Sequence, residues 1–409
     1  MRKMILILLM VSVLGALFCT GSNPMLQLPS EPNVSSISAS SNVNIKIQFV
    51  NNSGIAANRI HVVIRGLDRN KKQGFFDLTK DPIQWVQTSN YSVMPPAAKV
   101  PDVTLDQILA KNGGIITVPY SDSGRVYLAI DKRIYDESQV PNWMRRNLNN
   151  DVSFDKFELA VVDWGEGPNL NLTQVDFFNI PLKIETGGQV RGFRDGVTRK
   201  QIFDEYLAAV KNLTGIDSDW QKLIIQSKGK NMRILSPAKI VPDDTDFPNL
   251  RKYFDDLIKE YWKAGKTFNL LLGDGKVVVC TADGNKITAP GFGKYNKVTS
   301  VAMFGQEVHD GNDPDFIRWI SSAVNRGVIQ YQDNATIKNQ GNSNMFYGNS
   351  SSVNRNLYNY YSEFFHRDKY VYDNRAYALA FDDVFGRDSK LDIPIGSTIT
   401  VTIQPFGGE

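Results

Sequence analysis

Two carboxylates on neighbouring β-like runs are the residues of this sequence best placed for acid–base chemistry. Glu158 lies in the alternating run Phe154–Val162, and Asp176 lies in the next run, Asn171–Phe178. Acids on neighbouring strands project from one face when their alternation phases agree. If one carboxyl has an apolar setting and the other a polar one, their pKa values separate, as an acid and base pair needs near neutral pH. On this pattern alone, two solvated surface acids remain the alternative.

Other kinds of catalytic site receive less support. The three histidines form no HExxH pair, and Gly273–Gly275 lies between two apolar runs, which predicts a hairpin turn and not a phosphate loop. The run Glu307–Asp313 lacks the alternating oxygen ligands and the terminal Glu of a calcium loop. Cys280 ends an apolar run, which favours a buried, inert thiol over a nucleophile. We therefore expect neither a metal site nor a cofactor.

The elements around the two acids are short alternating runs separated by turn residues. They predict strands within Ile45–Val50, Ile60–Ile64, Gly114–Val118, Val126–Ile130, Phe157–Val162, Val175–Ile184, Tyr377–Phe381 and Ser397–Ile403. This pattern is typical of an antiparallel sandwich or barrel. We therefore assign residues 44–194 and 375–409 to one β-domain.

Residues 195–374 change to helical periodicity. Thr198 and Gln201 make a capping box ahead of the first helix. Apolar stripes predict further helices over 249–263, 314–327 and 357–364, and strand-like runs lie at Val277–Cys280 and Val301–Phe304. We expect these residues to form a mixed α/β domain inserted into the β-domain.

The amino terminus has the three parts of a secretory signal. Two basic residues precede the apolar run Met4–Phe18, and small residues follow up to Gly21. The run is too short to span a bilayer, so we expect residues 1–21 to be removed and 22–43 to be a flexible leader. A retained anchor and a lipoprotein acylated at Cys19 are the alternatives to a secreted protein.

The composition of the 409 residues excludes several protein classes. Apolar residues make up 42% and charged residues 22%, which excludes a wholly disordered or a polytopic membrane protein. The formal net charge is only +3, so we expect binding neither to nucleic acid nor to an anionic membrane. One cysteine remains after signal removal, so the mature fold must be stable without a disulfide.

The run that contains Asp176 resembles a known family signature. Asn171–Leu182 is similar to the N-x-[ST]-x-V-D-F-x-x-x-P pattern of glycoside hydrolase family 64, the β-1,3-glucanases related to thaumatin-like proteins. Phe49–Gly54, Ser123–Tyr127 and Tyr377–Val384 resemble the family's opening strand and turn, its SGR-[IV]-Y strand and its late Y-x-F-x-[YF]-D-D-V stretch. The matches follow the family order and span residues 45–405.

This resemblance implies a thaumatin-like β-barrel or sandwich, an α/β domain beside it and a wide groove between the two. It also implies a secreted endo-type β-1,3-glucanase that releases short laminari-oligosaccharides with inversion. Glu158 matches the general acid and Asp176 the general base, with carboxyls ~6.5–9.5 Å apart. We expect a monomer whose partner is the β-1,3-glucan polysaccharide.

Four further residues are expected to contact the substrate. Thr173 matches the hydroxyl beside the base, and Trp164 offers a ring face to a pyranose in the loop between the acids. Asp382 and Asp383 are expected to bind substrate in the groove. Loop packing is the alternative role for Trp164, and a place in a strand-end turn is the alternative for the two aspartates.

The sequence departs from the family pattern beside the predicted acid. Ala160 and Val162 share the alternation of Glu158 but are apolar, where the resemblance implies polar contacts to sugar. The alternatives to an enzyme are therefore a non-catalytic β-glucan-binding protein and a secreted effector that binds a host protein, both on the same scaffold.

Overall fold

A computed structural model of the chain describes residues 43–87, 101–134, 151–165, 167–240, 245–305, 314–348 and 357–408. Residues 42–409 form one compact unit. The predicted signal, Cys19, almost all of the predicted leader and the run 307–313 lie outside the described residues. None of the described helices has the length and hydropathy needed to cross a bilayer.

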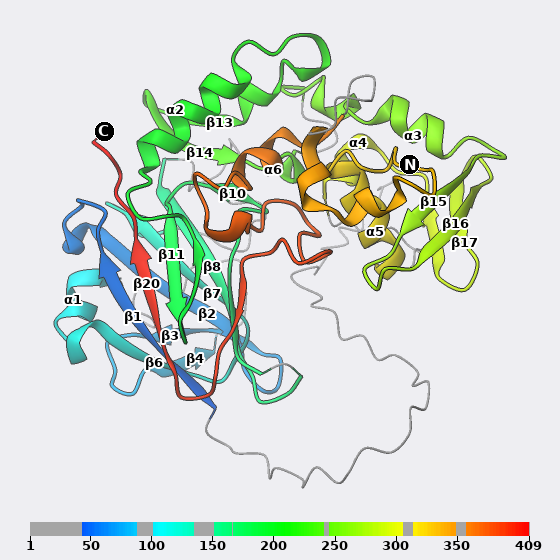
Figure 1. The fold of residues 1–409 in the computed structure, drawn as a ribbon. Helices are drawn as coiled ribbons and strands as arrows, with labels where there is room; N and C mark the ends of the chain where they lie inside the picture. Colours follow the sequence, from blue (N-terminus) through cyan, green and yellow to red (C-terminus); the bar gives the residue numbers. More distant parts are fainter. Residues whose placement is uncertain are drawn as a thin grey trace, which may run out of the picture. The chain divides into compact units, whose positions relative to one another are not determined.

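Two β-sheets form a sandwich (Figure 1). The smaller sheet has the order β12 (Gln189–Gly192), β11 (Leu182–Thr186), β20 (Thr398–Ile403), β1 (Asn44–Asn51) and β6 (Ile115–Pro119). The larger has the order β19 (Lys390–Asp392), β9 (Asn169–Leu172), β8 (Ser153–Val161), β7 (Ser121–Ile130), β2 (Ile60–Leu67), β3 (Gln73–Asp77) and β4 (Gln84–Gln87), with β5 (Val103–Thr104) beside β2. Alternating apolar side chains of both sheets make one shared core.

The carboxy-terminal strand belongs to the smaller sheet, as the alternating run at 397–403 predicts. β20 pairs in parallel with β1, where Phe49 lies opposite Val401, and antiparallel with β11. The two ends of the described chain are therefore joined in one sheet. The sandwich form of the predicted β fold is confirmed, whereas the described strands form no closed barrel.

The residues between the sandwich strands build two small sheets and short helices. Their apolar side chains form a second core together with residues of the larger sheet such as Val63, Tyr127 and Phe154. One sheet has the order β10 (Phe177–Phe178), β14 (Lys230–Leu235) and β13 (Ile224–Ser227). The other has the order β15 (Thr267–Leu271), β16 (Val277–Ala282), β17 (Lys286–Ala289) and β18 (Gly293–Asn296). Gly275 has a φ of 83° in the hairpin turn between β15 and β16, which confirms the turn predicted there. The division of the compact unit into two domains stays a prediction.

Helices are few and short in the described chain. They are α1 (Leu105–Leu109), α2 (Arg199–Val210), α3 (Asp255–Tyr261), α4 (Ser300–Phe304), α5 (Pro314–Asn325) and α6 (Tyr360–Phe365). Single 3-10 turns are η1 (Ala57–Arg59), η2 (Asn112–Gly114), η3 (Gly215–Asp217), η4 (Trp220–Leu223), η5 (Pro237–Lys239), η6 (Leu250–Lys252), η7 (Ile337–Gly341), η8 (Ser343–Gly348) and η9 (Tyr372–Asn374). The capping box predicted for α2 is confirmed in part: Gln201 N donates to Thr198 Oγ1 over 3.1 Å, while the Gln201 side chain donates to Glu205 Oε1 over 2.9 Å.

Four predictions of local structure are wrong. The run Val175–Ile184 forms two strands and not one, since β10 pairs with β14 and β11 pairs with β20 in another sheet. Val301–Phe304 is helical and not a strand, because Thr299 Oγ1 accepts a hydrogen bond from the backbone of the first turn and begins a helix there. The helix predicted over 249–263 is divided into η6 and α3 by Phe254, whose ψ of 6° is not helical. In Tyr377–Phe381 only Tyr377 pairs, through a single bridge to Thr173, and the chain then turns.

Candidate active site

A row of polar residues crosses the larger sheet on the face that points away from the sandwich core. Residues directly opposite one another in the ladder share a face, and this row consists of Arg65 in β2, Arg125 in β7, Glu158 in β8, Asn171 in β9 and Lys390 in β19. Their chain neighbours Ile64, Val126, Phe157, Leu172 and Leu391 all belong to the sandwich core. Glu158 therefore stands at the centre of a polar face whose position follows from strand alternation.

Asp176 reaches the same face from the segment that joins β9 to β10. This segment is held by contacts with two distant parts of the chain. Gln174 N donates to Tyr377 O over 2.8 Å, and Ser236 N donates to Asp176 O over 3.0 Å. β10 then pairs with β14, so Asp176 lies between strand β9 of the larger sandwich sheet and the small sheet formed by β10, β14 and β13.

Lys156 joins the two carboxylates. It precedes Glu158 by two residues on β8 and therefore shares its face. Its Nζ donates to Asp176 Oδ2 and lies 4.0 Å from Glu158 Oε1. A hydrogen bond from Lys156 Nζ to Asp176 Oδ2 spans ~3 Å, and Glu158 Oε1 lies 4.0 Å from the same Nζ. These two carboxylate oxygens are therefore at most ~7 Å apart. The structure thus brings together the two acids that the sequence singles out.

Asp176 is an ionised carboxylate in a buried position. Its side chain is only 6% exposed, and Lys239 Nζ lies 2.7 Å from Oδ1. Burial would raise the pKa of Asp176, but Lys156, Lys239 and Arg125 outweigh it and hold the pKa well below its ordinary value. Near neutral pH the site therefore contains an ionised Asp176 between two ammonium groups.

Glu158 is the more accessible of the two acids. Its side chain is 15% exposed, and Arg125 Nε lies 3.4 Å from Oε1. Ala160, two residues further along β8, lies opposite Asn169 on the same face. Val162 is buried beyond the end of the strand. Ala160 is therefore an apolar residue on the same face as the acid, directly beside it along β8.

Thr173 and Trp164 occupy very different places. Thr173 is buried, and its Oγ1 accepts from Val175 N over 3.3 Å, so its hydroxyl stabilises the segment that leads to Asp176. Trp164 is 44% exposed in the loop after β8. Its Nε1 donates to Tyr120 Oη over 3.4 Å, and Lys71 Nζ lies 5.3 Å from the ring centroid. The contacts of Trp164 are thus with these neighbours and not with the carboxylates.

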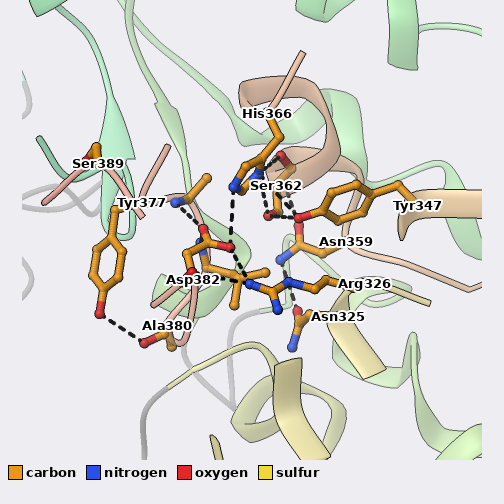
Figure 2. A network of polar contacts seen from close by, with 12 residues as sticks. Asn325, Arg326, Tyr347, Asn359, Ser362, His366, Tyr377, Ala380, Asp382 and Ser389 are labelled. Carbon is orange, nitrogen blue, oxygen red and sulfur yellow. Dashed lines mark hydrogen bonds and ion pairs between the residues drawn. The ribbon is translucent and has the colours of Figure 1, made fainter. Parts of the chain in front are cut away.

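Asp382 is a fully buried residue that organises a turn. Figure 2 shows its polar contacts. Its Oδ2 accepts from Ala378 N over 2.7 Å and from Leu379 N over 2.9 Å. Its Oδ1 lies 3.3 Å from Arg326 Nη2 and 3.4 Å from His366 Nε2. Burial, opposed by Arg326, raises the pKa of Asp382 to about 6. Both oxygens are engaged inside the protein, so Asp382 presents no group to a substrate on the surface.

Asp383, the next residue, is 37% exposed at its side chain and pairs with Arg318 of α5. Burial of the carboxyl raises its pKa, and Arg318 opposes that effect. The adjacent aspartates predicted to bind substrate are therefore not equivalent. One lies in the core and the other lies at the surface.

The network in Figure 2 extends from Asp382 to α5 and α6. Tyr347 Oη lies 2.8 Å from Ser362 Oγ and 3.3 Å from His366 Nδ1. Burial lowers the pKa of His366 to about 3, so the imidazole is neutral. Ser389, at the end of the same turn region, donates to Leu172 O of β9. These contacts join the helices to the strand that leads to Asp176.

Sequence reasoning missed the cations of the site. Lys156 carried a usable signal, because it shares the alternation of Glu158 within an otherwise apolar run. Lys239 carried none, because it comes from the distant turn η5. Asn171 lies in the family signature, but only the strand pairing shows that it is the direct ladder neighbour of Glu158.

One depression of the described surface lies outside this site. It is lined by Pro248, Arg251, Lys252, Thr299 and Val301, none of which belongs to the polar face. The described residues contain no group of three or more His, Cys, Asp and Glu side chains that could hold a metal ion.

Comparison with known proteins gives consistent findings. The family model for β-1,3-glucanases of glycoside hydrolase family 64 matches residues 43–403. The laminaripentaose-producing β-1,3-glucanase of that family from Paenibacillus barengoltzii is 18% identical, with a TM-score of 0.60 over 91% of this chain and 78% of that chain. A family 64 domain from Clostridium beijerinckii is also 18% identical, with a TM-score of 0.66 over 91% of this chain and 100% of that one.

A third solved structure is a laminaripentaose-producing β-1,3-glucanase in complex with laminaritetraose. It is 21% identical to this chain, with a TM-score of 0.66, and the match covers 90% of this chain and 99% of that one. No curated protein matches the chain. At these identities the structural likeness shows a shared fold.

Proposed function

Because the chain belongs to glycoside hydrolase family 64, the β-1,3-glucanases, it is a glycoside hydrolase, and we propose that Glu158 and Asp176 carry out its reaction. One observation supports this assignment above the others. The two carboxylates lie on one polar face within reach of the same ammonium group, and one of them is held ionised. An acid and a base with unlike environments are what hydrolysis of a glycosidic bond requires.

The proposed reaction is an inverting hydrolysis of β-1,3-glucan. Protonated Glu158 donates its proton to the glycosidic oxygen as the bond from that oxygen to C1 breaks. Asp176 accepts a proton from the water whose oxygen attacks C1 on the opposite face of the sugar. The upper limit of ~7 Å between the carboxyl oxygens is compatible with the short end of the ~6.5–9.5 Å range of inverting enzymes.

The remaining features of the proposal rest on weaker support. The neighbours named laminaripentaose-producing and the laminaritetraose complex support short β-1,3-linked oligosaccharides as products and an endo-type site that binds several glucose units. The exposed ring of Trp164 is proposed as a remote platform for glucose and Asp383 as a surface contact, while Thr173 positions the base. The basic and apolar amino terminus supports export. That the exported protein is a monomer is part of the proposal.

The test is hydrolysis of laminarin by the purified protein and by Glu158→Gln and Asp176→Asn. Glu185→Gln is the matched control, since this glutamate lies in the smaller sheet with a side chain that is 41% exposed. Each site variant should lose ~10²–10⁴-fold of the rate, and the control should not. The first product of the parent should be the α-anomer by NMR. Either site variant with the parental rate contradicts the assignment.

A non-catalytic β-glucan-binding protein is the second candidate. The apolar Ala160 beside Glu158 favours it, because a polar side chain there would be able to hydrogen-bond sugar. In that case the parent would bind laminarin and release no reducing ends, and the three variants would behave alike.

A further inference from the structure

Five charged groups of alternating sign run through the proposed site. In spatial order they are Arg125, Glu158, Lys156, Asp176 and Lys239, with contacts of 3.4 Å at the first pair, 4.0 Å at the second and 2.7 Å at the last. Lys156 is the central member, because its Nζ donates to Asp176 Oδ2 and lies 4.0 Å from Glu158 Oε1. Lys239 contacts Asp176, and Arg125 contacts Glu158.

Lys156 is more deeply buried than its chemistry favours. Its side chain is 1% exposed, compared with 27% for Lys239 and 19% for Arg125. Lysine is almost never fully buried unless it is paired, and a buried ion pair by itself adds little to stability. The burial of this ammonium group between two acids therefore calls for a role beyond holding the fold.

The backbone around the site is secured by another residue. Asp155, on the opposite face of β8, accepts hydrogen bonds from the backbone N–H groups of Lys156, Asn179 and Ile180 over 2.7, 2.7 and 2.8 Å. The strand and the segment after Asp176 are thus fixed to each other without the ammonium group. What the Lys156 side chain adds is a positive charge between the two carboxyls.

We propose that Lys156 is a positioning residue of the hydrolytic site and the shared counter-ion of its two acids. The proposal rests on the proposed function. Before reaction the negative charge is on Asp176, to which Lys156 donates. When Glu158 has given its proton to the leaving oxygen and Asp176 has taken one from water, the charge is on Glu158, 4.0 Å from the same Nζ. The cation is therefore next to the negative charge in both states.

Several other charged or titratable groups lie near the two acids and have to be considered in a pH profile. Arg125 acts on both acids, Tyr361 faces Asp176, Tyr377 faces Glu158, and Asp155 adjoins Lys156. Burial holds the pKa of both tyrosines well above its ordinary value, so they stay neutral. Burial raises the pKa of Asp155 to about 7, but Asp155 is present in every variant compared below.

The test is the pH profile of kcat/KM on laminarin for Lys156→Met and Lys239→Met. Loss of a cation within ~4–6 Å raises a carboxyl pKa by ~1–3. Lys156→Met should therefore move the alkaline limb to higher pH, whereas Lys239→Met should leave that limb in place, because Lys239 contacts Asp176. Lys156→Arg should keep the alkaline limb near the parental position. An unmoved alkaline limb in folded Lys156→Met, or an equal movement in Lys239→Met, overturns the proposal.

A second measurement decides the assignment when turnover or folding fails. Double-mutant cycles of unfolding should show coupling of Lys156 to both Asp176 and Glu158, and coupling of Lys239 to Asp176 only. If the parent releases no sugar, the proposed function fails, while the cycles still decide whether Lys156 is the shared counter-ion. If Lys156→Met does not fold, Lys156→Gln, which also removes the charge, replaces it in the cycles, and absence of coupling to Glu158 overturns the proposal.

Discussion

Replacement of Asp176 by asparagine should destabilise the protein through the charges that it leaves behind. The substitution keeps the size of the side chain and removes its negative charge. Lys156 then stays buried with its hydrogen-bond partner neutralised, and Lys239 loses the carboxylate 2.7 Å from its Nζ. Unfolding measurements on this variant therefore test the contribution of Asp176 to the ion cluster and do not depend on catalytic activity.

The expected magnitude follows from these contacts. At an effective dielectric constant of ~20, a pair at the distance of Lys239 has a gross interaction of ~6 kcal/mol, most of which desolvation offsets. Removal of one partner from a buried pair costs ~3–5 kcal/mol. For an unfolding unit of this size the entropy of unfolding is roughly 0.8 kcal/mol/K, so the Tm should fall by ~4–6 °C.

The assay is urea unfolding followed by tryptophan fluorescence at pH 7 and at pH 3. Because the folded-state pKa of Asp176 is lowered, its stabilisation is present above the unfolded pKa of ~3.9 and is lost as pH falls towards the folded value. The difference between parent and variant should therefore be smaller at pH 3. Asp383→Asn is the matched control, since its partly exposed pair with Arg318 should contribute less than ~1 kcal/mol.

Two results would refute this reasoning. One is a cost of Asp176→Asn below ~1 kcal/mol at pH 7, which would mean that the cluster adds no net stability. The other is an equal cost at both pH values, which would mean that the effect comes from packing and not from charge.

Two further predictions concern groups outside the acid pair. The pKa of Asp382 is raised by burial to about 6, so its stabilising contribution is present below ~3.9 and lost as pH rises through about 6. Urea unfolding at pH 4.5 and pH 7 should show part of this pH-dependent free energy of unfolding, which totals about 3 kcal/mol, in the parent and not in Asp382→Asn. An equal change in the free energy of unfolding between the two pH values in both proteins would contradict the prediction. Burial also raises the pKa of the Cys280 thiol to about 12. The native protein should therefore give no reaction with a thiol reagent until urea is added, and rapid labelling without urea would show that the thiol is accessible.

Local patterns in the sequence predict most of the sandwich. Alternation in Ile45–Val50 corresponds to β1, because a strand with one face in a core must alternate. The continuous apolar run Val126–Ile130 corresponds to β7, which is buried on both faces. The cap at Thr198 predicts where α2 begins for an equally local reason. Val301–Phe304 shows the limit of this reasoning, since a short apolar run fits either element and the cap at Thr299 decides it.

By itself, the sequence determined the strand pattern, the family signature and the two acids that the signature contains. Only the tertiary structure decided what surrounds those acids. Lys239 and Asp176 are far apart in the chain and meet because β10 pairs with β14, which no local pattern encodes. Asp382 and Asp383 look alike in sequence, yet one lies in the core and the other at the surface. The physical reason is the same in both cases: burial and ion pairing depend on residues distant in the chain, so they arise only when the chain is folded.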